Sequence, residues 1–194
     1  MTSPTVTRAG IVEATRELIR FEGLDAVSLR RVGRAVGVTA PALYAHVRDK
    51  EDLLKAVAAT QYGELVERLN AVERLDPLDR VRASCHVYVD LALDEPELFR
   101  TMFLFPPALD QVDPLGVELD AATEAFGLSA AAATAAVDGG LLVGDPMTIS
   151  FALWTASHGL ASVLQMGLQL SEEQQTDLTD TVIDGLLTGL AAPT

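Results

Sequence analysis

The sequence has little cysteine and, after its midpoint, no positive charge. Cys85 is the only cysteine among 194 residues, which excludes an intrachain disulfide bond. We expect Cys85 to be a small buried residue in a reducing compartment. The first ten residues lack a basic segment followed by an apolar run, so the sequence predicts no signal peptide and a cytoplasmic location.

The residue patterns of common enzymes are also missing. No Ser, His and Asp stand in a recognisable catalytic context, no helix carries paired histidines, and no glycine-rich phosphate loop occurs. His86 and His158 are too isolated in sequence to indicate a metal site, and nothing indicates a cofactor. The sequence therefore predicts a protein that is neither an enzyme nor a metalloprotein.

One long stretch carries no charge at all. It runs from Pro146 to Ser171, which is long enough to span a bilayer. However, it contains several Ser, Thr and Gln residues, and no basic residue flanks either end. Such a segment fits a helix buried among other helices better than a membrane span, so we expect no membrane association.

Charge is distributed unevenly along the chain. The net charge is −14, but residues 1–55 hold nine basic and seven acidic side chains, whereas the rest holds five basic and 21 acidic ones. Such asymmetry indicates that the two parts have different partners. Because phosphate binding depends on local charge at the contact face, the acidic remainder does not exclude a nucleic-acid partner.

The pattern throughout is helical. Alanine and leucine are abundant, apolar residues recur at helical spacing, and Gly and Pro stand between the periodic segments. Ser28, Thr39 and Asp49 each stand where a side chain can cap a helix, and the helix after Thr39 is expected to run from Ala40 to Ala45. We predict an all-α protein, with two long final helices near 146–168 and 172–191.

The segment from 29 to 50 has the spacing of a helix-turn-helix, in which the second helix enters the major groove. Leu43 and Val47 are four residues apart and should face the core, which leaves Thr39 and Tyr44 on the outward face. The motif taken alone is also compatible with a packed helical corner that binds nothing.

These residues also resemble a known family. The stretch GVTAPALYAHVRDKEDLL, preceded by GLDAVSLRRVGRAVGV, is similar to the DNA-binding domain of the tetracycline-repressor (TetR) family. LWTASHGLASVLQMG is similar, more weakly, to a late helix of that family. The resemblance implies a DNA-binding domain over 1–50 and a helical ligand-binding and dimerisation domain over 51–194.

The resemblance also implies site residues. Base-edge or groove-facing positions fall on Arg30, Thr39, Ala40 and Pro41, and phosphate contacts on Tyr44, His46 and Lys50, with Arg48 adjacent. Alanine at residues 40 and 42 departs from the polar residues often found there. Gly33 replaces the usual alanine, at a cost of roughly 1 kcal/mol of helix preference, which predicts a slightly less stable domain.

In the second domain, the family implies a small-molecule pocket and a homodimer formed by the last two helices. Small residues (Ala156, Gly159, Ala161) and final-helix residues (Val182, Ile183, Leu186, Leu187, Leu190) are expected at the dimer seam. Candidate pocket residues are the aromatic, Met and His side chains Tyr88, Phe99, Met102, Phe103, Phe126, Trp154 and His158, although core packing is an alternative for each. The absence of basic residues predicts a largely apolar or cationic effector.

The sequence therefore predicts a transcriptional regulator. Its partners would be a palindromic double-stranded DNA operator, bound as a homodimer, and a small effector that releases it. The alternative is a helix-turn-helix protein whose second domain binds other proteins and senses no ligand.

Overall fold

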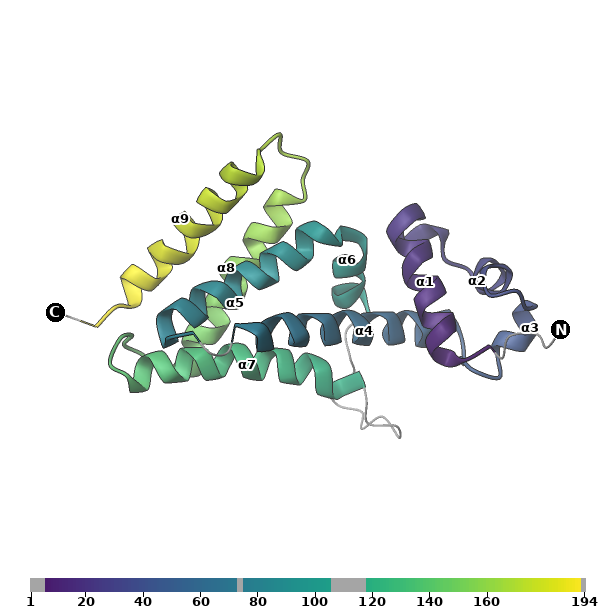
Figure 1. Ribbon diagram of the computed structural model, residues 1–194, viewed down its shortest axis with the longest axis horizontal. Helices are drawn as coiled ribbons and strands as arrows, with labels where there is room; N and C mark the ends of the chain where they lie inside the picture. The colour runs from purple at the N-terminus through teal and green to yellow at the C-terminus, as the bar shows by residue number, and fades with distance from the viewer. Residues whose placement is uncertain (1–5, 73–74, 106–117, 193–194) are drawn as a thin grey trace. The chain divides into compact units, whose positions relative to one another are not determined.

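The computed structural model describes residues 6–72, 75–105 and 118–192. These residues form α-helices and one short 3-10 helix without any strand, so the all-α prediction is confirmed. Figure 1 labels the helices along the chain. Their bounds are α1 (Arg8–Glu22), α2 (Leu29–Ala35), α3 (Ala40–Leu43), α4 (Lys50–Ala71), α5 (Pro77–Asp94), α6 (Pro96–Leu104), α7 (Glu118–Asp138), α8 (Pro146–Leu164) and α9 (Glu172–Leu190).

Packing divides the chain into two compact units. The first, called the head unit below, comprises residues 1–62 and 97–122, and the second, the body unit, comprises 63–96 and 123–194. Helix α4 contributes to both units. The units are defined by packing alone, so the functional boundary predicted between residues 50 and 51 stays a prediction.

Local signals set the helices of the head unit. The side chain of Thr7 caps α1, which ends at Gly23 with φ of 82°, a conformation that glycine adopts without strain. The Ser28 hydroxyl accepts a hydrogen bond from the Arg31 amide and caps α2, as predicted. Buried side chains of the head helices, including Ile11, Val32, Leu43 and Leu53, form one core.

The turn after α2 differs from prediction in two respects. Thr39 occupies the N-cap position of α3, but its side chain makes no capping hydrogen bond. Helix α3 ends at Leu43, two residues early, and residues 44–46 continue as turns. The Thr39 hydroxyl is exposed, so its polar group is available to a partner outside the chain.

The start of α4 is organised by two carboxylates. Asp49 accepts the Asp52 amide at 2.8 Å and so caps the helix, as predicted. Asp52 is buried and accepts from the Arg8 guanidinium at 3.1 Å and from the Arg48 amide at 2.9 Å. One carboxylate therefore holds together the start of α1, the end of the helix-turn-helix and α4.

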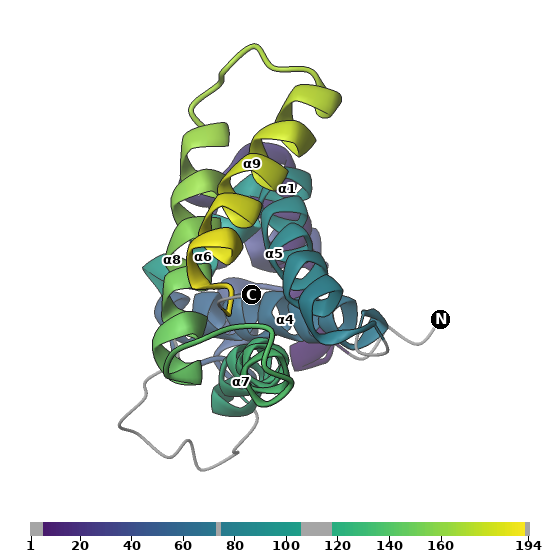
Figure 2. The same cartoon turned by 90° about the vertical axis from the view of Figure 1, so that its left-hand side faces the viewer.

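The body unit is built around α5, α7, α8 and α9. Cys85 of α5, Ala133 of α7, Ile149 of α8 and Ile183 of α9 belong to one buried cluster. Figure 2 shows α8 and α9 as neighbouring antiparallel helices joined by the 165–171 connection. Burial raises the pKa of the Cys85 thiol to about 11, in line with the expected inert residue.

Helix α8 is shorter than the uncharged stretch that contains it. The prediction placed its end near residue 168, but the helix stops at Leu164, and Gly167 adopts a φ of 80° that breaks helical geometry. It begins at Pro146 with Asp145 as its cap. The following connection leads to Ser171, which caps α9 in a capping box with Gln174.

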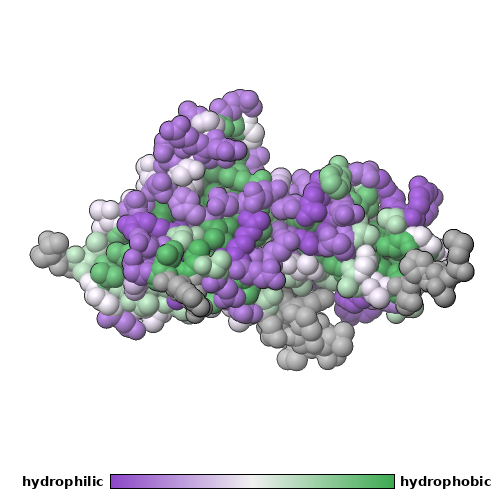
Figure 3. All heavy atoms as spheres, in the orientation of Figure 1, coloured by the Kyte–Doolittle hydropathy of each residue, from purple (hydrophilic) through white to green (hydrophobic). Residues whose placement is uncertain are grey.

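Apolar surface remains exposed along α8. By length and composition the helix could cross a bilayer, but core helices of soluble proteins share these properties, and 39% of its apolar window is buried within the chain. Hydrophobic residues are visible between hydrophilic ones on the face of the molecule drawn in Figure 3. The exposed large side chains of α8 are Met147, Phe151, Trp154 and Val163.

Candidate DNA-binding and effector sites

The outward face of α3 carries the predicted groove-facing residues. Leu43 and Val47 are buried in the core of the head unit, which fixes the rotation of the short helix. Thr39 and Pro41 are exposed, and Tyr44 keeps 59% of its surface accessible. Ala40, also predicted to face the groove, is half-buried. The arrangement presents a hydroxyl, a phenol and small apolar groups together on one surface.

The charged residues beside this face fall into two kinds. Arg30 and Lys50 are exposed and have no ion-pair or hydrogen-bond partner in the described part of the chain. Arg48, by contrast, pairs with Asp52 at 3.0 Å, although its side chain is 84% exposed. His46 is half-buried, and its carbonyl oxygen accepts a hydrogen bond from Arg8 at 2.9 Å.

The Asp52 carboxyl has a lowered pKa because it accepts hydrogen bonds from Arg8 and Arg48. Burial alone would raise the pKa of its carboxyl, but hydrogen bonds from Arg8 and from the amide and guanidinium of Arg48 lower that pKa to about 2. Asp52 is therefore ionised at neutral pH. Its negative charge compensates part of the positive charge of both arginines.

Gly33 allows α2 to approach the turn closely. A Cβ atom there would lie 2.9 Å from the Val38 carbonyl oxygen and 3.3 Å from the Ala40 amide. Loss of helix preference is therefore only part of the account of Gly33, because an alanine Cβ would crowd the backbone of the turn.

In the body unit, three of the predicted pocket residues form a hydrogen-bonded group. The Trp154 indole N–H donates to the Tyr88 hydroxyl oxygen at 3.1 Å, and that oxygen lies 3.0 Å from His158 Nδ1. Burial lowers the pKa of His158, which favours the neutral ring. A Tyr88 hydroxyl that accepts from Trp154 can donate to Nδ1, which leaves the imidazole proton on Nε2.

The aromatic group extends further along α8. The rings of Phe126 and Phe151 lie 5.0 Å apart, and Phe151 lies 6.3 Å from Trp154. Together with Tyr88 and His158, these residues are called the aromatic cluster below. Phe151 was not among the predicted pocket residues, although its spacing of three from Trp154 and seven from His158 on one helix could have identified it.

The remaining pocket candidates lie on α6, in the head unit. Phe99 and Met102 are buried, and Phe103 is half-buried with its ring 5.0 Å from that of Phe99. The structure therefore brings four of the seven candidates together in the body unit and places the other three on α6 in the head unit. Among the described residues, no group of three or more His, Cys, Asp or Glu side chains could hold a metal ion.

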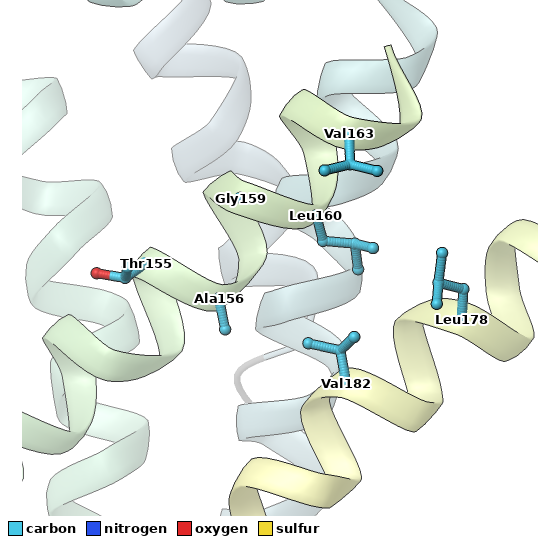
Figure 4. Close-up of a pocket in the computed structure, with 7 residues that line it drawn as sticks. All are labelled: Thr155, Ala156, Gly159, Leu160, Val163, Leu178 and Val182. Carbon is cyan, nitrogen blue, oxygen red and sulfur yellow. The ribbon is translucent and has the colours of Figure 1, made fainter. Parts of the chain in front are cut away.

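An apolar groove of about 320 Å³ runs between α8 and α9. Figure 4 shows Leu160 and Val163 on one helix facing Leu178 and Val182 on the other. Ala156 and Gly159 also line it, together with Thr155. We call this the α8–α9 groove.

The dimer seam expected from the sequence is partly used within the chain itself. Ala161, Ile183 and Leu187 are buried within the same subunit, so their assignment to the dimer seam was wrong. The reason is helix rotation, because these residues point to the side of α8 and α9 that packs on α5 and α7. Val182, Leu186 and Leu190 are only half-buried.

Two models of known protein families match the chain. Residues 11–57 match the family model described as bacterial regulatory proteins, tetR family. Residues 81–186, more than half of the chain, match the one described as tetracyclin repressor-like, C-terminal domain. The chain belongs to the TetR family. This family consists of all-α, helix-turn-helix, DNA-binding transcription regulators, which are not enzymes.

Related regulators match different lengths of this TetR-family chain. The class D tetracycline repressor of Escherichia coli is 34% identical over 53 residues, which cover 27% of this chain and 24% of the repressor. The chain thus spans about a quarter of that relative. An uncharacterised HTH-type transcriptional regulator of Mycobacterium tuberculosis is 26% identical over 179 residues, which cover 92% of this chain and 79% of the relative.

Two solved structures share the fold. A protein of unknown function from Rhodococcus sp. RHA1 has a TM-score of 0.83 at 24% identity, over 98% of this chain and 100% of that one. AibR, in complex with isovaleryl coenzyme A and operator DNA, has a TM-score of 0.68 at 20% identity, over 96% and 99% of the two chains.

Proposed function

We propose that this chain is a cytoplasmic repressor that binds a palindromic operator as a homodimer and is released by a small effector. The observation that carries the proposal is the exposed face of α3 with Thr39 and Tyr44, together with the exposed cations Arg30 and Lys50, which have no partner among the described residues. Residues 1–50 would bind DNA, and residues 51–194 would bind the effector and the second subunit.

The DNA contacts follow from the chemistry of each exposed group. Two N–H groups of the Arg30 guanidinium can donate hydrogen bonds to the edge of a guanine base. The Thr39 hydroxyl can hydrogen-bond a neighbouring base, and Ala40 and Pro41 can contact a thymine methyl group. Tyr44, His46 and Lys50 would bind phosphates. Arg48 is the last residue of the proposed DNA interface. Because Asp52 already compensates Arg48, we expect that residue to contribute less than Lys50.

The homodimer is supported by the α8–α9 groove. Val163 lies in the groove and keeps 44% of its surface exposed, and Gly159 has no neighbouring atom within 4 Å of the position of a Cβ. Because these small and branched apolar residues leave open surface on α8 and α9, the same two helices of a second copy can pack there around a two-fold axis. Two heads related by that axis require a palindromic operator.

The effector is expected to bind at the aromatic cluster, with Phe99, Met102 and Phe103 of α6 as further candidates. Phe151 and Trp154 are 49% and 41% exposed, so a ligand can reach their rings. The arginines of the described body unit already have partners: Arg68 binds Asp94, Arg80 the Leu128 carbonyl and Arg82 Asp184. Because these arginines are already paired, the body unit favours an uncharged or cationic apolar effector over an anion such as the acyl-coenzyme A bound by AibR.

The experiment uses the single tryptophan as a reporter. A compound collection would be screened for changes in Trp154 fluorescence, and each hit would then be tested for its effect on DNA affinity. Typical coupling of about 1–3 kcal/mol predicts a 5- to 150-fold weaker complex in the presence of the effector. Fluorescence hits that leave DNA affinity unchanged would contradict release by an effector at this cluster.

A further inference from the structure

The basic residues of the head unit differ in how far the chain itself neutralises them. Most of those with described positions already have acidic or amide partners. These pairs are Arg8 with Asp52, Arg16 with Glu13 and Gln61, Arg31 with Glu22, Arg48 with Asp52, Lys55 with Glu51, and Arg100 with Glu97. Arg20 has an interaction as well. All of these residues add to the positive charge of the sequence, but in the folded chain their charge is already compensated by neighbouring groups.

Three cations have no such partner in the described part of the chain: Arg30, Arg34 and Lys50. All three are exposed. Arg30 and Arg34 lie four residues apart on α2, so their side chains project from the same side of the helix about one turn apart. The buried residue Val32, two positions from each of them, is on the other side of the helix and faces the core.

From this we infer that Arg34 is a further DNA phosphate contact, beside the groove-facing residue Arg30. The inference depends on the proposed DNA complex. An exposed guanidinium without an internal partner gains a full phosphate contact and releases a counterion, whereas a paired one must first give up its carboxylate. Because the contact would be to phosphate, Arg34 would strengthen binding to any DNA sequence.

Another role for Arg34 follows from its position in the last turn of α2. There a positive charge also interacts favourably with the helix dipole. That role would affect folding stability but not the number of cations released when DNA binds. The salt dependence of DNA binding therefore separates the two roles.

The test measures the affinity of the full chain for a mixed-sequence DNA duplex over a range of salt concentrations. Arg34→Gln is compared with Arg31→Gln, a matched change on the same helix at a residue already paired with Glu22. Arg34→Lys retains the charge, and Lys50→Gln serves as a positive control. Thermal unfolding of each variant records any loss of stability separately.

We expect Arg34→Gln to reduce the slope of log K against log salt by about 0.9 for each bound head, or about 1.8 for the proposed dimer, with roughly eightfold weaker binding per lost contact at 0.1 M salt. Arg31→Gln and Arg34→Lys should keep the wild-type slope. An Arg34→Gln slope equal to that of wild type, while Lys50→Gln lowers it, would overturn the inference and leave the proposed function intact. A wild type without measurable DNA binding would overturn the proposed function and, with it, this contact.

Discussion

The amide of Val38 donates a hydrogen bond to the carbonyl oxygen of Gly33 across 2.8 Å and so closes the turn between α2 and α3. The same turn brings the Val38 carbonyl oxygen to 2.9 Å from where a Cβ of residue 33 would lie. Real Cβ atoms do not approach backbone atoms so closely. The glycine therefore sets the distance between the two helices of the helix-turn-helix.

Gly33→Ala should destabilise the protein even though alanine is the better helix former. The gain in helix preference is about 1 kcal/mol, whereas overpacking against backbone atoms costs roughly 1–3 kcal/mol and moves α3. We expect a lower free energy of unfolding in urea and weaker DNA binding. Gly63→Ala is the matched control, because a Cβ there meets no atom within 4 Å in the middle of α4. That variant should be as stable as wild type or more stable, and equal stabilisation by both changes would contradict the account.

Asp52→Asn should lower stability at neutral pH and have less effect in acid. The pKa of the Asp52 carboxyl is about 2 in the folded protein, below its ordinary value, so its contribution is complete above about pH 4 and is lost as pH falls toward 2. The shift corresponds to roughly 2 kcal/mol at pH 7. Urea unfolding at several pH values should show the difference from wild type shrinking below pH 4. Glu17→Gln, at an exposed residue of α1, should show no such trend. A pH-independent effect of Asp52→Asn would refute the ion-pair explanation.

The fluorescence of Trp154 should report the protonation of His158. Burial lowers the pKa of this imidazole, so protonation should occur below the ordinary value of about 6.5. The charged ring can no longer accept from Tyr88, whose oxygen also binds the indole. We expect a fluorescence change with a midpoint below pH 6.5 that Tyr88→Phe alters and His158→Gln removes. His86→Gln, at a histidine paired with Asp180, should leave the midpoint unchanged. Persistence of the transition in His158→Gln would show that another group causes it.

Val163→Glu should dissociate the proposed homodimer. It places a charge in the α8–α9 groove, and leaving a buried charge unpaired costs about 3–5 kcal/mol, which predicts at least 100-fold weaker association. Sedimentation velocity over a range of concentrations measures this directly. Ser162→Glu adds the same charge at the neighbouring exposed residue and should remain dimeric. If both variants sediment like wild type, the groove is not the interface.

Local chemistry made part of this structure predictable from sequence. The caps at Ser28 and Asp49 and the buried pair Leu43 and Val47 depend on neighbours only a few residues away. For that reason the helix-turn-helix could be predicted, whereas the family followed from the resemblance of these residues to known regulators. The Tyr88–His158 hydrogen bond joins residues 70 positions apart, so the sequence could offer them only as separate candidates.

Other features depend on contacts that a pattern does not encode. Helix α8 is apolar on every side, so its periodicity could not show that Ala161 faces the core while Val163 faces outward. The close approach at Gly33 is likewise invisible in sequence. Arg31 differs from Arg34 because it pairs with Glu22, a contact between two helices that the sequence pattern does not indicate.

The central claim is that this TetR-family chain reads DNA through the exposed face of α3. The most direct measurement is selection of bound fragments from the source organism's genomic DNA at fixed salt, with Tyr44→Ala as the comparison. Tyr44 is 59% exposed, so its loss should remove a contact without disturbing the core. We expect wild type to enrich one palindrome and Tyr44→Ala to enrich none. A folded wild-type dimer that enriches no sequence, or a Tyr44→Ala variant that enriches the same palindrome equally well, would contradict it.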